Sequence, residues 1–194
     1  MSDFVSIVEV FAFVTGILYV VLEIFQKNAM WIVGILSGAA CAVSFGMQHL
    51  WASMLLNVYY VGMSVSGFIQ WKEASGQTGG AIHLARPSRN TLLASAAVFL
   101  AGSAVLVLVL KLLGDSESVM DAVVAVASAI GTWWLAKSYP QQWLIWIAAD
   151  MLSTILCIVS GMHWMALLYA AYTVSAVYGY IHWVRVGRYV DETI

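Results

Sequence analysis

Charged side chains are scarce in this sequence. Lys, Arg, Asp and Glu make up only 9% of the 194 residues, whereas 62% are hydrophobic. A soluble domain carries about 25% charged residues, so the composition argues against a soluble protein. The eight Lys and Arg residues form no basic tract, which argues against a nucleic-acid partner. The two cysteines, Cys41 and Cys157, both fall in apolar runs, so we expect neither a disulfide nor a zinc site.

Long apolar runs fill most of the chain. At about 20 to 25 residues for each crossing of a bilayer, its length fits seven spans. The N-terminus lacks the basic region of a cleaved signal peptide, so we expect the first run to be a retained span. The longest connection, residues 72–90, contains three glycines and a proline and is typical of a polar surface loop. We therefore expect an all-α membrane protein with spans at 4–25, 29–47, 50–71, 91–113, 119–136, 142–160 and 163–184.

The basic residues are distributed unequally between the two sides of these spans. One side holds Lys111 alone, and the other holds the remaining seven Lys and Arg residues. Basic residues concentrate in cytoplasmic loops. We therefore expect the N-terminus outside the cell and the C-terminus in the cytoplasm, in a bacterial inner membrane.

The sequence contains an internal repeat. Trp31 near the start of the second span and Trp143 near the start of the sixth are 112 residues apart, as are Trp71 and Trp183 at the ends of the third and seventh. Parallel repeats joined by one span occur in small transporters, where the substrate site lies at the repeat interface. We expect two parallel three-helix bundles joined by a linker helix, divided as 1–71, 72–118 and 119–194.

One acidic residue, Asp150, is expected near the middle of the bilayer. Trp143, Trp146 and Asp150 lie at i, i+3 and i+7 and share one helix face. Asp150 would lie about 12–14 Å into the sixth span, and an acid at such a depth is usually functional. Since no Lys or Arg is expected at this depth, we predict a cationic substrate as its partner. The alternatives are a hydrogen-bonded structural Asp150 and an interfacial anchor role for Trp143.

Further aromatic and polar residues are candidates for the same cavity. Indole and phenol faces bind cations with about 0.5–2 kcal/mol per contact. In the third span Asn57 and Tyr60 share a face, and at the 112-residue offset they match Tyr169 and Tyr172 in the seventh. Hydrogen bonding between helices is an equal alternative for these four side chains. Trp133 in the fifth span is a further candidate. The acids near span ends, Glu9, Glu23 and Asp121, are expected to be structural.

Several motifs resemble the pyridine nucleotide uptake (Pnu) family of bacterial vitamin transporters. The segment Trp143-Leu-Ile-Trp146-Ile-Ala-Ala-Asp150 is similar to the family's W-x-x-W-x-x-x-N signature. The segments 18–23, 30–34 and 55–60 also resemble that family. The resemblance covers nearly the whole chain and implies a fold like that of SWEET sugar transporters, with three, one and three helices. It further implies a homotrimer and facilitated diffusion of an unphosphorylated vitamin, trapped afterwards by cytoplasmic phosphorylation.

Two positions bear on which vitamin is carried. Asp150 stands where the nicotinamide riboside branch typically has Asn, and Asn57 where it typically has Gln. On this basis we expect the thiamine branch, with nicotinamide riboside second. Both vitamins are cations that suit a carboxylate and aromatic faces. Riboflavin is neutral and fits less well.

Other classes of membrane protein fit the sequence poorly. A retinal photoreceptor needs a buried lysine, and the seventh span has none. An intramembrane enzyme needs paired catalytic groups or metal ligands, but all four histidines fall in loops or at span ends and no H-E-x-x-H occurs. Primary active transport would require a phosphate-binding loop, and none is present. We therefore expect a transporter without catalytic, metal or cofactor sites, and proton coupling through Asp150 stays an open alternative.

Overall fold

The helices of the chain correspond closely to the predicted spans. The computed structural model describes residues 16–47, 51–112, 118–159, 161 and 163–190. Residues 16–24 are helical and belong to the first predicted span, whose residues 4–15 lie outside the described part, as does Glu9. The following helices are α2 (Ala29–Met47), α3 (Trp51–Thr78), α4 (Arg89–Leu112), α5 (Ser118–Ala136), α6 (Gln142–Val159) and α7 (His163–Val186).

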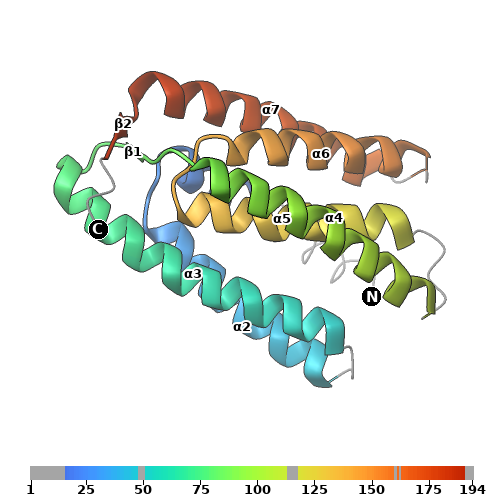
Figure 1. Ribbon diagram of the computed structural model, residues 1–194. Helices are drawn as coiled ribbons and strands as arrows, with labels where there is room; N and C mark the ends of the chain where they lie inside the picture. The colour runs from blue at the N-terminus through green and yellow to red at the C-terminus, as the bar shows by residue number, and fades with distance from the viewer. Residues whose placement is uncertain (1–15, 48–50, 113–117, 160, 162, 191–194) are drawn as a thin grey trace.

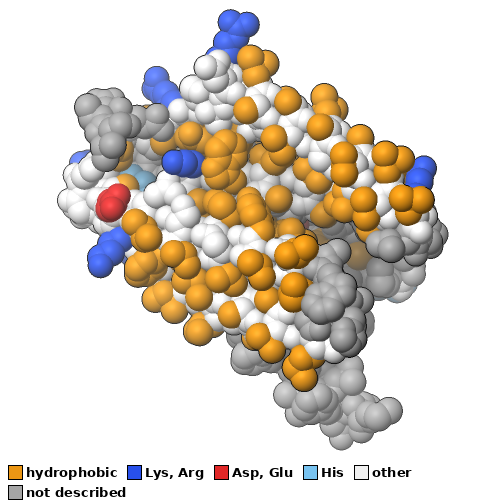
Figure 2. All heavy atoms as spheres, turned by 60° about the horizontal axis from the view of Figure 1, so that its bottom comes forward, with side chains coloured by type: hydrophobic (Ala, Val, Ile, Leu, Met, Phe, Trp, Pro, Cys, Tyr) orange, Lys and Arg blue, Asp and Glu red, His pale blue; other side chains and the backbone are white. Residues whose placement is uncertain are grey.

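The helices run roughly side by side in one bundle (Figure 1). The most extensive contacts pair α2 with α3 and α6 with α7, and α5 lies between these pairs, in contact with α3, α4 and α6. Among the described residues, α4 and α6 are long and apolar enough to cross a bilayer. In α4 the only buried described residue is Ser95, and hydrophobic side chains predominate on the face of the molecule that Figure 2 shows. Such an apolar exterior suits a lipid environment.

The turns that follow the first and fifth helices have the same backbone conformation. Gln26 and Ser138, 112 residues apart, both adopt a positive φ, of 50° and 56°. The backbone hydrogen bonds around them also repeat, with Gln26 N donating to Glu23 O and Ser138 N donating to Leu135 O. The Gln26 side chain donates to Ser138 Oγ at 3.3 Å, so the two turns touch. These two turns therefore share one backbone conformation at the 112-residue offset found in the sequence.

The repeated tryptophans pack in the same way in both halves. The rings of Trp31 and Trp71 meet edge to face with centroids 5.0 Å apart, and those of Trp143 and Trp183 do so at 5.6 Å. All four indoles are almost completely buried. They form the main hydrophobic core at one end of the bundle, together with Met30, Leu84, Leu135 and others.

Two indole hydrogen bonds cross between the halves at this end. Trp71 Nε1 donates to Leu135 O at 3.2 Å, and Trp183 Nε1 donates to Ile24 O at 2.9 Å. Ile24 and Leu135 occupy nearly equivalent places near the ends of the first helix and α5. Each half therefore anchors its last tryptophan on the other half.

Two glycines allow the tryptophans to pack this closely, and their substitution should destabilise the protein. A Cβ at Gly67 would overlap the Trp31 ring, and one at Gly179 would lie 2.7 Å from the Trp143 ring. Overpacking of this kind costs about 1–3 kcal/mol, so Gly67→Ala and Gly179→Ala should each lower the thermal unfolding temperature in detergent. Gly62→Ala in α3 is the control, since a Cβ at Gly62 meets nothing within 4 Å. Equal unfolding temperatures for all three variants would contradict this packing.

The connection between α3 and α4 differs from the prediction. The sequence predicts a polar surface loop at 72–90, but α3 continues to Thr78, and His83–Leu84 form a buried strand, β1. This strand pairs in parallel with β2 (Arg188–Tyr189), with His83 opposite Arg188. The Gln26 side chain also accepts a hydrogen bond from His83 N at 2.7 Å and donates to His83 O at 2.9 Å. The polar backbone is satisfied by these partners, which is why the segment can be buried.

The β1 segment should detach from the bundle as the pH falls. His83 is 5% exposed and its Nε2 has no partner among the described residues. Burial lowers the pKa of His83 to about 4 from an ordinary value of about 6.5. The neutral ring therefore stabilises the folded segment above about pH 6.5, and this stability, up to about 3 kcal/mol, is lost as the pH falls through 4.

Amide hydrogen exchange of residues 82–84 tests whether the β1 segment detaches at low pH. It is measured between pH 7 and 4 and corrected for the intrinsic exchange rates. Protection should fall toward pH 4 in the unmodified protein and stay level in His83→Phe, which keeps a ring against Trp71. The same pH dependence in both proteins would refute the role of His83.

Candidate substrate cavity

A cavity of about 340 Å³ lies between the first helix, α5, α6 and α7. Its volume is at the lower end of the roughly 300–1,000 Å³ usual for small-molecule sites. Most of the described lining side chains are apolar or aromatic, with a few polar groups among them. They are Gly16, Tyr19, Val20, Glu23, Val124, Ser128, Trp143, Trp146, Ala149, Asp150, Ser153, Tyr169, Tyr172 and Ala176.

Helix α6 supplies one wall of the cavity. It begins directly after the turn that contains Pro140, and Trp143, Trp146 and Asp150 all line the cavity from it. Trp143 is 2% exposed and seated on Gly179, whereas Trp146 and Asp150 are half-buried. The shared face predicted from the i, i+3, i+7 spacing is therefore confirmed. Their contact with a substrate stays a prediction.

Tyrosines of α7 line the opposite part of the cavity. The rings of Tyr169 and Tyr172 pack edge to face with centroids 6.3 Å apart. A Cβ at Gly16 of the first helix would overlap the Tyr172 hydroxyl, so a glycine is required there for this ring position. Both tyrosines lie within electrostatic range of Asp150. The cavity thus places aromatic rings around one carboxyl group.

A second carboxyl group, that of Glu23, lines the cavity although the sequence suggested a structural role for it. Glu23 is 5% exposed and accepts a hydrogen bond from Gln142 Nε2 at 3.2 Å. Lys27, its possible partner one turn later, is exposed instead. Gly16, Tyr19, Val20 and Glu23 follow the i, i+3, i+4, i+7 pattern of one helix face, and this spacing was the available signal.

The described cavity lining offers two carboxyl groups and unpaired donors but no basic side chain. Neither Lys nor Arg occurs among its described residues. The indole Nε1 atoms of Trp143 and Trp146 are buried and have no hydrogen-bond partner within the described part of the chain. A buried donor without a partner costs about 1–3 kcal/mol. The arrangement therefore suits a cationic molecule that also accepts hydrogen bonds.

The structure does not bring three of the predicted residues into this cavity: Asn57, Tyr60 and Trp133 are absent from its described lining. Trp133 lines a different groove between α3, α4 and α5, and Tyr60 packs on Tyr59 of its own helix. Of the two faces predicted to match, the α7 face with Tyr169 and Tyr172 is the one found in the described lining. Substrate contacts of Asn57, Tyr60 and Trp133 stay a prediction.

The reason lies in the residues of α2 that match the α6 wall. At the 112-residue offset, Trp146 corresponds to Gly34 and Asp150 to Gly38. A Cβ at Gly34 would lie 2.7 Å from Ser64 Oγ, and one at Gly38 would lie 2.9 Å from Val61. Helix α2 therefore closes against α3, and its half has no side chains equivalent to the indole and carboxylate of α6.

The family model for the nicotinamide mononucleotide transporter matches residues 6–185 of this chain. The chain belongs to this transporter family. The Pnu family assignment made from the sequence is thus confirmed, and the chain is an all-α membrane protein.

Relatives in the nicotinamide mononucleotide transporter family align with most of the chain. The nicotinamide riboside transporter PnuC of Neisseria mucosa is 30% identical over 192 residues, covering 91% of this chain and 72% of the relative. The Escherichia coli protein of the same name is 22% identical, covering 94% and 87%. A crystal structure of the vitamin B3 transporter PnuC shares 29% identity and has a TM-score of 0.65, covering 90% of this chain and 79% of the other. These names do not support the predicted thiamine branch and do support the second choice.

Proposed function

We propose that this chain is a membrane transporter that carries nicotinamide riboside by facilitated diffusion. The observation that carries the proposal is the cavity with two carboxyl groups, aromatic walls and no basic residue in its described lining. Nicotinamide riboside is a pyridinium cation attached to a ribose. A cation held against a carboxylate and aromatic faces gains both charge attraction and ring contact.

The charge of the cavity favours the riboside over its phosphorylated form. A phosphate monoester carries about −1.5 to −2 charge at pH 7. In this cavity it would lie close to Glu23 and Asp150 with no described lining cation to offset the repulsion. We therefore propose that nicotinamide mononucleotide is rejected and that phosphorylation in the cytoplasm traps the riboside after entry.

Thiamine is the second candidate. It too is a cation, and Asp150 stands where the riboside branch typically has Asn. The names of the relatives favour nicotinamide riboside instead. A transporter role, rather than that of an enzyme, agrees with the relatives named above.

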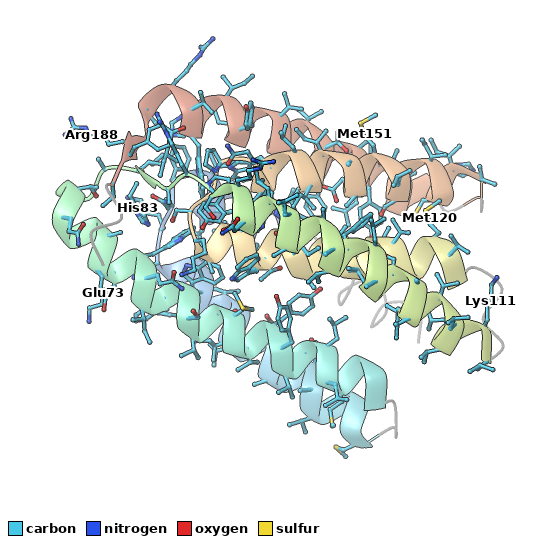
Figure 3. The ribbon with its side chains drawn as sticks, in the orientation of Figure 1. Glu73, His83, Lys111, Met120, Met151 and Arg188 are labelled. Carbon is cyan, nitrogen blue, oxygen red and sulfur yellow. The ribbon has the colours of Figure 1, made fainter. Side chains whose placement is uncertain are left out.

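We extend the proposal to the architecture. The contacts of α2 with α3 and of α6 with α7, and the turns repeated at an offset of 112 residues, support two parallel three-helix bundles joined by α4. The proposed division stays 1–71, 72–118 and 119–194, although α3 continues beyond the first boundary to Thr78. Glu73, His83 and Arg188 lie at one end of the bundle and Lys111 and Met120 at the other (Figure 3). We propose that the end with Arg188 faces the cytoplasm of a bacterial inner membrane; the homotrimer stays a prediction.

Counterflow in sealed liposomes tests the transport function. Labelled nicotinamide riboside outside should exchange with unlabelled riboside inside without any ion gradient. Nicotinamide mononucleotide inside should not support the exchange, and liposomes without protein give the baseline. Accumulation of unmodified riboside driven by an imposed proton gradient would contradict facilitated diffusion, and exchange of thiamine alone would select the second candidate.

A further inference from the structure

The cavity has two acidic side chains, which stand beside different turns of α6. Gln142, the first residue of α6, donates a hydrogen bond to Glu23 of the first helix. Asp150 lies eight residues after Gln142 on α6. At 1.5 Å per residue this separation is about 12 Å. The two carboxyl groups lie within electrostatic range of each other, but they stand beside different turns of α6 and have different neighbours.

The groups around Asp150 suit a flat cationic ring. Trp146, Tyr169 and Tyr172 line the cavity with it and offer aromatic faces and edges. Ring cations gain about 0.5–2 kcal/mol from each such face. This part of the cavity therefore fits the pyridinium end of the riboside.

The groups around Glu23 suit hydroxyl groups. A carboxylate has about four acceptor positions, and the one described hydrogen bond to Glu23 comes from Gln142. Gln142 is completely buried and holds the carboxyl group in place. Trp143 also lines this end, is 2% exposed, and has an indole N–H without a partner in the described part of the chain. Glu23 thus accepts hydrogen bonds and the Trp143 N–H donates one. The hydroxyls of a vicinal diol can donate to the carboxylate and accept from the indole.

We infer that Glu23 binds the ribose hydroxyls of the substrate, with Gln142 as the residue that positions its carboxylate and Trp143 as the donor opposite. This inference rests on the proposed function and adds to it the part of the substrate that each acid recognises. It also explains a buried carboxylate without a basic partner, because hydroxyl donors satisfy a carboxylate by charge-assisted hydrogen bonds.

A binding cycle with two ligands and two proteins tests the inference. The ligands are nicotinamide riboside and its 2′,3′-dideoxy analogue, which has the same charge but no vicinal diol. The proteins are the unmodified chain and Glu23→Gln, and affinities are measured by calorimetry in detergent. In the unmodified protein, loss of the diol should weaken binding about 10- to 100-fold, since hydrogen bonds to a charged group are worth about 1.5–3 kcal/mol.

In Glu23→Gln we expect riboside binding to weaken by about tenfold or more and dideoxy binding to change by less than about twofold. If both ligands lost affinity equally, Glu23 would act on the cation. If the riboside affinity were unchanged, Glu23 would not contact the substrate. Either result overturns the inference. Glu73→Gln, at an exposed carboxylate near the end of α3, is the matched control and should match the unmodified protein.

A second variant keeps the inference testable if Glu23→Gln does not fold. Glu23→Asp keeps the charge and shortens the side chain, so it should keep dideoxy binding and lose most of the preference for the diol. Retention of the full preference in a folded Glu23→Asp protein would also overturn the inference. If the unmodified protein bound thiamine and not the riboside, the proposed function itself would fail, which is a separate outcome.

Discussion

Asp150→Ala is expected to weaken nicotinamide riboside binding by about 10- to 150-fold. The substitution removes a half-buried carboxylate that lines the cavity beside Tyr169 and Tyr172. Loss of a charge-assisted contact of this kind is worth about 1.5–3 kcal/mol. Calorimetry on purified protein measures the effect. An affinity equal to that of the unmodified protein would mean that Asp150 is a structural group.

Asp150→Asn separates the charge from the hydrogen bond at the same position. Asn keeps an acceptor oxygen and is typical of the riboside branch that the sequence resembles, so riboside binding should fall by less than about tenfold. The neutral dihydro form of the riboside should bind this variant as well as it binds the unmodified protein. If the dihydro form lost as much affinity as the cation, the charge of Asp150 would not be what recognises the substrate.

Trp146→Ala is expected to weaken riboside binding by about 30- to 300-fold. The indole lines the cavity one turn from Asp150, and its buried N–H has no partner within the described residues. The substitution removes a ring face and a donor, which together are worth about 2–3.4 kcal/mol. Trp146→Phe keeps a ring and should recover part of the affinity.

Trp133→Ala is the matched control for Trp146, because Trp133 is also half-buried but lies in the groove between α3, α4 and α5. It should change riboside affinity by less than about twofold. A loss at Trp133 as large as that at Trp146 would place the substrate in the other groove and contradict the site.

Local patterns predicted the parts of the structure that depend on one helix. The apolar runs gave helix bounds close to those of α2, α5 and α6, because each run must satisfy its backbone within itself in a bilayer. The spacing of Trp143, Trp146 and Asp150 gave the face that lines the cavity. Helical periodicity alone was sufficient for both.

The parts that depend on distant contacts were missed. The partner of Glu23 is Gln142, 119 residues away, and burial of His83 depends on pairing with Arg188 and on the Gln26 side chain. Neither contact leaves a local pattern. Asn57 and Tyr60 were assigned to the cavity by assuming that the repeat is symmetric. Close packing of α2 on α3 at the glycines of α2 makes the cavity asymmetric.

The proposal that this cavity recognises a nicotinamide riboside cation is tested most directly by one binding panel. Purified protein is titrated calorimetrically with nicotinamide riboside, nicotinamide mononucleotide, thiamine and riboflavin under one set of conditions. We expect the riboside to bind at least about tenfold more tightly than the other three, because it alone joins a pyridinium cation to a free ribose and carries no phosphate. If thiamine bound more tightly than the riboside, or the mononucleotide bound equally well, the cavity would not be a site for the nicotinamide riboside cation.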